Sequence, residues 1–518
     1  MSSPHEKRSP RWSSLCVFLV ALGLLAGFAR LHEVTVPLVH DEYAYLLSAD
    51  TFVHGRLTNP SHPLWEHFET FHVLQHPSYQ AKYPPAQGMA LALGQWLGHP
   101  VVGVWISWAL ALAALHWMLS GLMRQRWALL GTLLTFVTPY LFLIWGQTYW
   151  GGAVATLGGA LLFGGIVRLR QEPRLLDGLA IGTGLFLLGN SRPMEGVMTA
   201  LLAMGLFATA IRRHVLEDRG RQLATRVLVP FGLGLALLVA WTLYYNWRVV
   251  GTPFTLPYFR YHPEVSPHLD IRSYTGSPNM SVLGKGHRLA TGVLGLPLLA
   301  ALPFSLRRLR TPYLLSFSLI AYVVVLLVLA SSRAWPHYIA PVVPLLVFLT
   351  LAGLKALHAW RWRGTRIGTA LAALVVLAHL GYGGRAIGKR IAGGPLESWA
   401  KDRLEMIERL EAQGGEHLVL VRYGPERERN KEWIYNAADI DASPVIWARD
   451  LGPEGNRELL AYYPERTLWR VDVPPNRAQL VPVERPRIAE AAGALPASMP
   501  QGTATTADLQ DASSRRSQ

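Results

Sequence analysis

The most constraining feature of the sequence is a series of apolar stretches, each about long enough to cross a lipid bilayer. A span needs roughly 20 apolar residues, and it must be helical because lipid cannot satisfy the backbone polar groups. About eleven stretches meet this length, so we expect a mainly α-helical, polytopic membrane bundle. They are residues 13–31, 99–121, 126–145, 148–167, 175–190, 194–211, 227–246, 288–306, 312–330, 338–357 and 367–384.

Two of these assignments have alternatives. Residues 13–31 follow Lys7, Arg8 and Arg11, which is the arrangement of a secretory signal peptide. The apolar run is as long as a span needs to be, so we interpret it as an uncleaved first helix. Residues 175–190 and 194–211 could be one interrupted unit, but two short spans fit the charges better.

The charged residues predict an orientation. They make up 16% of the chain, against about 25% in soluble proteins. The net charge of +15 could indicate nucleic-acid binding, but the basic residues fall in alternate loops, as the positive-inside rule requires. We therefore expect no nucleic-acid partner, and a multi-pass protein of the plasma (inner) membrane with a cytoplasmic N-terminus. The inner-loop residues are Arg124, Arg126, Arg168, Arg170, Arg174, Arg212, Arg213, Arg219, Arg221, Arg226, Arg307, Arg308, Arg310, Lys355, Arg361, Arg363 and Arg366.

Three large segments are predicted on the outer side. Residues 32–98 and 247–287 are rich in Pro, His, Tyr and Trp, so they read as ordered loops with short interfacial helices at 41–53 and 85–97. The third segment predicts a small extracytoplasmic α/β domain at the C-terminus, with helices at 397–415 and 455–463. Its three predicted strands are 417–424, 443–450 and 466–473.

These patterns predict three parts of the chain. Residues 1–384 form the transmembrane domain, and residues 385–486 form the α/β domain. Residues 487–518 are rich in Ala, Ser, Thr, Pro and Gln, a composition that predicts a disordered tail.

Residues that could carry chemistry gather in the outer segments. Asp41 and Glu42 open the first loop, Lys82 lies near its end, and Arg192 falls at a later outer turn. The two cations could bind a phosphate at the lipid headgroup level. A carboxylate beside it could take a proton from an incoming hydroxyl or amine. Further candidates for a substrate pocket are Tyr83, Tyr149, Trp150, Glu195, His337 and Tyr338.

Each candidate also has a purely structural alternative. The acid pair could cap an interfacial helix, and Lys82 could be an interfacial lysine that extends to the headgroups. Arg192 and Glu195 could pair with each other. His337 and Trp150 could belong to an aromatic belt at the membrane surface.

Metal binding is a separate question. The first loop holds His40, His54, His62, His67, His72 and His76, and histidine near carboxylates favours a divalent metal. The spacings match no compact zinc signature, and the only individual ligand candidates are His40 and Asp41. The single cysteine, Cys16, excludes disulfides and cysteine-rich metal sites. The many glycines lie inside apolar spans, where close helix packing explains them.

The stretch "HDEYAYLLSAD" after the first span, "KYPP" about forty residues on and the late "HYIAPVVP" together resemble the GT-C class of membrane glycosyltransferases. The aminoarabinose transferases of lipid A and the protein O-mannosyltransferases are the most similar members that we can name. The resemblance is best over residues 1–200 and continues as a hydropathy pattern to about 384. It does not extend to the C-terminal domain.

The resemblance implies transfer of a sugar, hexose or pentose, from a polyprenyl-phosphate donor to an extracytoplasmic lipid, glycan or protein, usually with inversion. It makes Asp41 the catalytic carboxylate, Glu42 the second acid of the pair, and Lys82 a contact of the donor phosphate. Two departures concern the metal and the second acid. Ala81 stands where the aminoarabinose enzymes have a metal-binding glutamate. We find no second catalytic aspartate, a role for which Glu195 and His337 are candidates.

Two other classes of function compete with a transferase. A transporter or lipid flippase would place ionisable residues at the bilayer midplane, whereas these spans hold almost none beyond His116 and His379. An assembly protein could use residues 435–452 to bind a partner, although a plain loop explains that segment equally well. The sequence predicts neither the sugar, the acceptor nor the oligomeric state.

Overall fold

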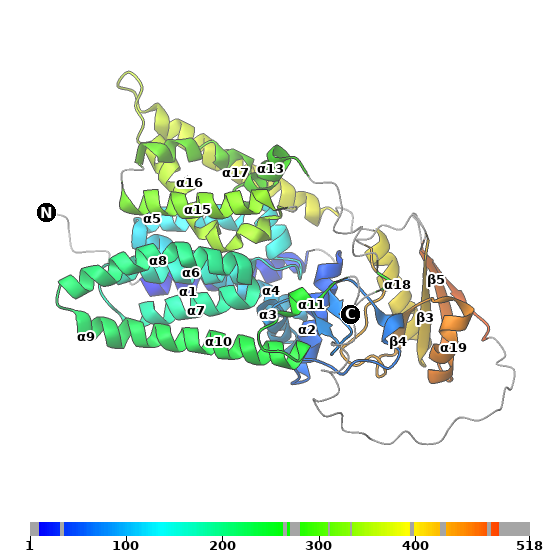
Figure 1. Cartoon of the computed structure of the whole chain (residues 1–518). Helices are drawn as coiled ribbons and strands as arrows, with labels where there is room; N and C mark the ends of the chain where they lie inside the picture. Colours follow the sequence, from blue (N-terminus) through cyan, green and yellow to red (C-terminus); the bar gives the residue numbers. More distant parts are fainter. Residues whose placement is uncertain are drawn as a thin grey trace.

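The computed structural model describes residues 10–31, 36–262, 267–269, 280–308, 311–331, 334–393, 398–424, 431–473 and 478–485. A bundle of long helices occupies one end of the molecule and a small α/β unit the other, with α2 and α3 between them (Figure 1). The mainly helical fold with a small sheet at the C-terminus is therefore confirmed. The tail predicted at 487–518 lies outside the described residues.

The bundle consists of apolar helices. Among the described residues, seven helical units are long and apolar enough to cross a membrane. They are α1 (Pro10–Ala29), α4 (Pro100–Leu122), α8 (Pro193–Leu216), α9–η3–α10 (Gly220–Leu223, Ala224–Leu228 and Val229–Val250), α15 (Pro312–Ala330), η6–α16 (Pro336–Val342 and Val343–His358) and α17 (Ile367–Ile391).

The remaining predicted spans are shorter or interrupted, so the count of about eleven is not confirmed. α6 (Ala153–Leu169) and α7 (Leu175–Ser191) are apolar but short, and the segment from α13 (Val282–Val293) through α14 (Leu296–Leu299) to η5 (Leu302–Arg308) bends by 105°. The stretch 126–145 divides into α5 (Gln125–Phe136) and the π-helical turn η2 (Leu141–Trp145). Pro139 lies between them, and a proline cannot continue the hydrogen-bond ladder of a preceding helix.

Glycines allow the close helix packing that the sequence predicts. A Cβ atom at Gly159 in α6 would lie 2.0 Å from the carbonyl oxygen of Pro341 in η6. A Cβ at Gly353 in α16 would lie 2.1 Å from the carbonyl oxygen of Ala301. Only glycine lets these backbones approach so closely, as is common between membrane helices.

The first outer loop is ordered. It contains α2 (His40–Val53), the 3₁₀ turn η1 (Trp65–Phe68), an antiparallel pair of β1 (Val73–Leu74) and β2 (Gln80–Ala81), and α3 (Pro85–Trp96). The two predicted interfacial helices are thus confirmed as helices. The second outer loop contributes a short helix, α11 (Pro257–Arg260).

The C-terminal unit is a four-stranded mixed sheet with two helices. Its elements are α18 (Ser398–Gln413), β3 (His417–Tyr423), β4 (Val445–Arg449), α19 (Gly452–Tyr462), β5 (Thr467–Val473) and β6 (Gln479–Pro482). The strand order is β4-β3-β5-β6, in which β3 is parallel to both neighbours and β6 is antiparallel to β5. The sequence predicts the three parallel strands but misses the edge strand β6.

One hydrophobic core joins this unit to the first outer loop. It contains Tyr43 and Phe68 from the loop together with Trp399, Trp433 and Trp447 from the C-terminal unit. The predicted boundary at residue 384 falls inside α17, which continues to Ile391. We call the residues of this shared core, with the loop and sheet that carry them, the outer unit.

Candidate functional site

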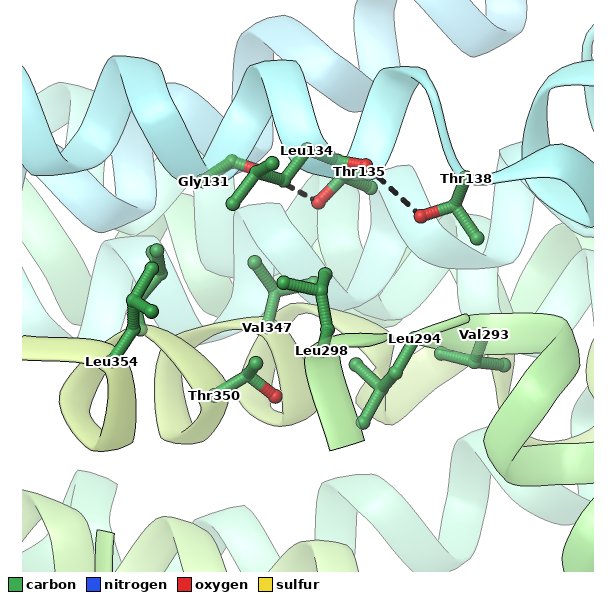
Figure 2. Close-up of a pocket in the computed structure, with 11 residues that line it drawn as sticks. Gly131, Leu134, Thr135, Thr138, Val293, Leu294, Leu298, Val347, Thr350 and Leu354 are labelled. Carbon is green, nitrogen blue, oxygen red and sulfur yellow. Dashed lines mark hydrogen bonds between the residues drawn. The ribbon is translucent and has the colours of Figure 1, made fainter. Parts of the chain in front are cut away.

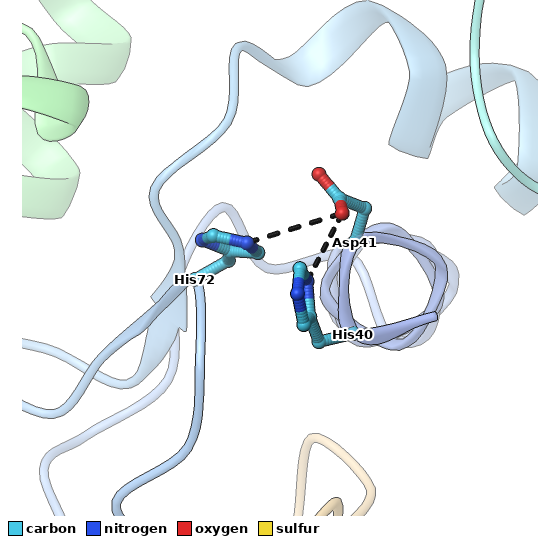
Figure 3. Close-up of side chains that lie close together, drawn as sticks. All are labelled: His40, Asp41 and His72. Carbon is cyan, nitrogen blue, oxygen red and sulfur yellow. Dashed lines mark ion pairs between the residues drawn. The ribbon is translucent and has the colours of Figure 1, made fainter. Parts of the chain in front are cut away.

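Asp41 lies at the start of α2, and its side chain is 20% exposed. Its Oδ2 lies 3.0 Å from Nδ1 of His40 and 3.9 Å from Nε2 of His72. Its Oδ1 accepts a hydrogen bond from the hydroxyl of Tyr83. The carboxylate is therefore held by groups from two parts of the first loop (Figure 3).

These neighbours determine the charge of Asp41. Burial alone would raise the pKa of this carboxyl group, but the imidazole of His72, the hydrogen bond and charge of His40 and the hydroxyl of Tyr83 outweigh it. The pKa of Asp41 consequently lies well below its usual value. The group is ionised at neutral pH and can accept a hydrogen bond or stabilise a cation.

Glu42, the next residue in α2, is 1% exposed and has other partners than Asp41. Its Oε2 accepts hydrogen bonds from the backbone N–H groups of Leu38 (2.6 Å) and Val39 (3.2 Å), and its Oε1 accepts one from Tyr149 (2.9 Å). Burial raises the pKa of Glu42 to about 7 despite these bonds. Glu42 therefore caps the N-terminus of α2, which is the structural alternative considered for the acid pair. Its bond to Tyr149 also connects the start of α2 to the loop before α6.

Lys82 is 7% exposed and faces three aromatic rings. Its Nζ lies 5.6 Å from the ring centroid of Tyr83, 4.7 Å from that of Tyr258 and 4.2 Å from that of Tyr261. Tyr258 lies in α11 and Tyr261 follows it, so the second outer loop closes over a cation from the first. Cation–π contacts of this kind favour the charged ammonium group.

Arg192 occupies the junction between α7 and α8. Its guanidinium carbon lies 5.4 Å from the ring centroid of Tyr338, and it interacts electrostatically with Tyr45 and Tyr83. Tyr45 in turn stacks on Tyr83 at 4.7 Å. Arg192 therefore belongs to the same group of tyrosines as Asp41 and Lys82.

The other predicted pocket residues divide into two sets. His337 contacts Tyr338 at 4.6 Å and Trp150 at 4.8 Å between ring centroids, so these three lie together beside Arg192. Glu195 is partly exposed and interacts electrostatically with Arg192. Tyr149 is 3% exposed and lies with Glu42 rather than with Asp41.

Three residues could hold a metal ion. The ligand atoms of His40, Asp41 and His72 all lie within 4.8 Å of one another (Figure 3). Two imidazoles and a carboxylate suit a divalent transition metal such as Zn²⁺. Sequence spacing misses this set because α2 and the loop before β1 meet only in the folded chain.

Two other first-loop histidines bind the C-terminal unit instead. His67 Nδ1 lies 2.9 Å from the carbonyl oxygen of Arg449, and His62 Nε2 lies 3.2 Å from Oδ1 of Asp441. The richness of this loop in histidine therefore reflects packing within the outer unit as well as any metal site.

A small pocket lies elsewhere, inside the bundle between α5, the α13–α14 segment and α16 (Figure 2). Its lining is mainly apolar, and the hydroxyls of Thr135 and Thr138 donate to backbone carbonyls of α5. Among the described residues that line it there is none of the predicted site residues. We therefore place the candidate site at Asp41.

Comparison with solved structures identifies the fold. No model of a known family matches the chain, and no curated protein matches its sequence. The structure of ArnT from Cupriavidus metallidurans bound to undecaprenyl phosphate is 14% identical with a TM-score of 0.53, covering 90% of this chain and 94% of that one. The structure of the same protein in the apo state is also 14% identical to this chain, with a TM-score of 0.51. The match covers 89% of this chain and 91% of that one.

An oligosaccharyltransferase of Archaeoglobus fulgidus, in complex with Zn and sulfate, is also similar. It is 12% identical with a TM-score of 0.52, over 88% of this chain and 67% of that one. The predicted resemblance to GT-C glycosyltransferases is thus confirmed as a likeness of fold. It covers 90% of this chain, whereas the sequence resemblance ends at about residue 384.

Proposed function

We propose that this chain is an integral membrane glycosyltransferase that takes a sugar from a polyprenyl-phosphate donor and passes it to an extracytoplasmic acceptor. One observation carries the proposal. An ionised carboxylate, Asp41, lies in the same group of tyrosines as two cations, Lys82 and Arg192, which come from different parts of the chain. Such a site can bind an anionic leaving group next to a proton acceptor.

The solved structure of ArnT with undecaprenyl phosphate supports the choice of donor. A lipid-linked phosphate would enter from the membrane, and Lys82 and Arg192 lie where the bundle meets the outer unit. Charge-assisted hydrogen bonds from these cations would bind its oxygens. We therefore assign Lys82 and Arg192 to the donor phosphate, with Tyr258 and Tyr261 positioning Lys82.

The proposed reaction is a single displacement. The acceptor hydroxyl or amine attacks the anomeric carbon, the bond from that carbon to the phosphate oxygen breaks, and the acceptor proton passes to Asp41. The electron pair of the broken bond leaves with polyprenyl phosphate. Lys82 and Arg192 are already in position and stabilise its negative charge. Attack opposite the leaving group inverts the anomeric carbon. Glu42 acts indirectly, by fixing the start of α2.

A divalent cation held by His40, Asp41 and His72 would supply positive charge beside the reacting groups. Protonation of the imidazoles would weaken such a site, because a metal ligand must be the neutral form. We assign this site to the non-cytoplasmic membrane surface. The turns around α9 and between α16 and α17 carry basic residues and lie at the opposite end of the bundle (Figure 1). Basic loops are typical of the cytoplasmic side.

Mass spectrometry of envelope lipids, glycans and proteins tests the proposal. Cells with the intact chain should contain a sugar-modified species that cells without it lack, together with more of the free polyprenyl phosphate product. An assay of the purified protein in vesicles distinguishes a glycosyltransferase from a transporter or flippase. Movement of a labelled lipid or solute across the vesicle membrane, without any glycosylated product, would instead favour a transporter or flippase.

A further inference from the structure

A tyrosine of the C-terminal unit lies directly behind the Asp41 site. The hydroxyl of Tyr435 lies 3.1 Å from the carbonyl oxygen of His40 and 3.2 Å from that of Phe71. The first carbonyl belongs to the peptide group that continues into Asp41, and the second to the peptide group that continues into His72. One hydroxyl therefore joins the two backbone segments that bring Asp41 and His72 together.

The Tyr435 side chain is itself firmly held. It is 7% exposed, and its ring stacks on that of Tyr43 in α2 at 4.3 Å with an interplanar angle of 7°. Arg403 of α18 donates hydrogen bonds to the backbone carbonyls of Tyr435 (3.0 Å) and Trp433 (3.2 Å). The guanidinium carbon of Arg403 also lies 5.1 Å from the Tyr43 ring centroid. These contacts with Tyr43 and Arg403 fix the position of the Tyr435 hydroxyl.

The backbone segment that contains Phe71 and His72 has an unfavourable conformation. His72 has a φ of +67°, a left-handed value that is uncommon for residues other than glycine. Such a conformation persists only where the surroundings determine it. The hydroxyl of Tyr435 holds the carbonyl before His72, and the N–H of Lys82 donates to the carbonyl of His72 itself at 2.9 Å.

We propose that Tyr435 is a positioning residue, through which the C-terminal α/β unit fixes the spacing of Asp41 and His72. The inference rests on the proposed function for its catalytic consequence. Tyr435 touches neither carboxylate nor imidazole, so it acts through the two backbone segments. The C-terminal unit is accordingly part of the catalytic structure and not an accessory module.

The test compares two phenylalanine variants. Tyr435→Phe removes the hydroxyl and keeps the stacked ring. Tyr79→Phe is the matched control, because Tyr79 is also buried and its hydroxyl donates across the same interface, to the carbonyl of Asn436 at 3.2 Å. That bond does not reach His40 or Phe71. Each variant therefore removes one buried tyrosine hydroxyl from the interface, but only Tyr435→Phe removes the contacts with the carbonyls of His40 and Phe71.

The first measurement is hydrogen–deuterium exchange of the purified full-length protein. Tyr435→Phe should speed exchange several-fold in peptides that cover residues 38–43 and 70–74, whereas Tyr79→Phe should leave both at the wild-type rate. Unchanged exchange in Tyr435→Phe, or equal acceleration in both variants, would overturn the proposal. This comparison needs no enzymatic activity. It therefore tests whether the Tyr435 hydroxyl holds the two backbone segments even if the wild type transfers no sugar.

The second measurement is turnover, followed as release of undecaprenyl phosphate from extracted donor lipids. A misplacement of about 1 Å can cost 10²-fold in rate, so we expect Tyr435→Phe to lose about 10- to 100-fold while its affinity for undecaprenyl phosphate stays within about twofold. Tyr79→Phe should keep its turnover. Wild-type turnover in Tyr435→Phe, despite faster exchange, would refute the positioning role. A wild type with no turnover would refute the proposed function instead.

Discussion

The two largest hydrophobic cores among the described residues are built in different ways. The bundle core consists mainly of Leu, Val, Ala and Phe from consecutive apolar helices, α1 to α17. The core of the outer unit combines aromatic residues from the first loop with the C-terminal sheet, segments far apart in the chain. Hydrogen bonds such as Tyr435 to His40 connect residues separated by 395 positions.

This difference determines what each core can do. Lipid surrounds the bundle, and its packing relies on close backbone contact at small residues. The outer unit instead brings charged and polar groups of several segments to one place and holds them. The candidate site lies where the two cores meet, so it depends on both.

The largest effect is expected from removal of the C-terminal half of the outer core. A chain that ends after residue 393 should keep its bundle but lose all transfer, because the first loop would expose the core residues that now face Trp433 and Trp447. Limited proteolysis should then cut within residues 36–98. A chain that ends after residue 485 is the control and should behave as wild type. Normal transfer by the shorter chain would contradict a shared core.

Removing either of the two cations that we propose for the donor phosphate should weaken donor binding. Hydrogen bonds to charged groups contribute about 1.5–3 kcal/mol, so Lys82→Ala and Arg192→Ala should each lower the affinity for undecaprenyl phosphate by about 10- to 100-fold. Lys389→Ala, which removes an exposed lysine at the end of α17, should have no effect. Microscale thermophoresis in detergent measures the affinities. Equal binding by all three variants would remove both residues from the donor site.

A methyl group added between two membrane helices should destabilise the bundle core. Gly159→Ala should lower the free energy of unfolding by about 1–3 kcal/mol, the usual cost of overpacking, because its Cβ would meet the carbonyl of Pro341. Gly205→Ala in α8 is the control, since nothing lies within 4 Å of its Cβ position. Thermal unfolding followed by fluorescence reports both variants. A normal melting temperature for Gly159→Ala would show that these helices can separate without cost.

The smallest expected effect concerns pH and the outer core. Glu69 is fully buried, and burial raises its pKa from 4.5 to about 7, although the N–H of His268 and the charge of Arg449 favour the ionised form. The folded state then binds more protons than the unfolded state between these values. The stabilisation is present below pH 4.5 and is lost as the pH rises through about 7.

Glu69→Gln should therefore remove part of this pH dependence. Wild-type melting temperature should fall as the pH increases from 5 to 8, and the variant should fall less, because its amide does not titrate. Thermal scans in a series of buffers test the sign directly. A steeper fall in the variant than in the wild type would contradict a raised pKa at Glu69.

The sequence predicts the parts of the fold that depend on local pattern. Apolar runs predict the membrane helices, and the C-terminal pattern predicts α18, α19 and the strands β3, β4 and β5. The stretch 126–145 fails as one span because Pro139 interrupts it. β6 is missed because it is a short edge strand of four residues ending in Pro482.

The site is predictable only where its residues stand beside a recognisable motif. Asp41, Lys82 and Arg192 are found from the outer loops and the GT-C resemblance. Tyr258 and Tyr435 are not, because their contacts with the first loop arise only when distant segments fold together. For the acid pair, the sequence offers both a catalytic and a capping role but does not reveal that Glu42 is the carboxylate that caps α2.

In the proposed reaction, Asp41 accepts the proton of the acceptor at a site that both cores hold in place. Turnover of wild type and Asp41→Asn, with undecaprenyl phosphate release measured at saturating donor, tests it most directly. General-base assistance contributes typically 10²–10⁴-fold, so the variant should lose about that factor while keeping its affinity for undecaprenyl phosphate. An Asp41→Asn protein that transfers sugar at the wild-type rate would contradict the account.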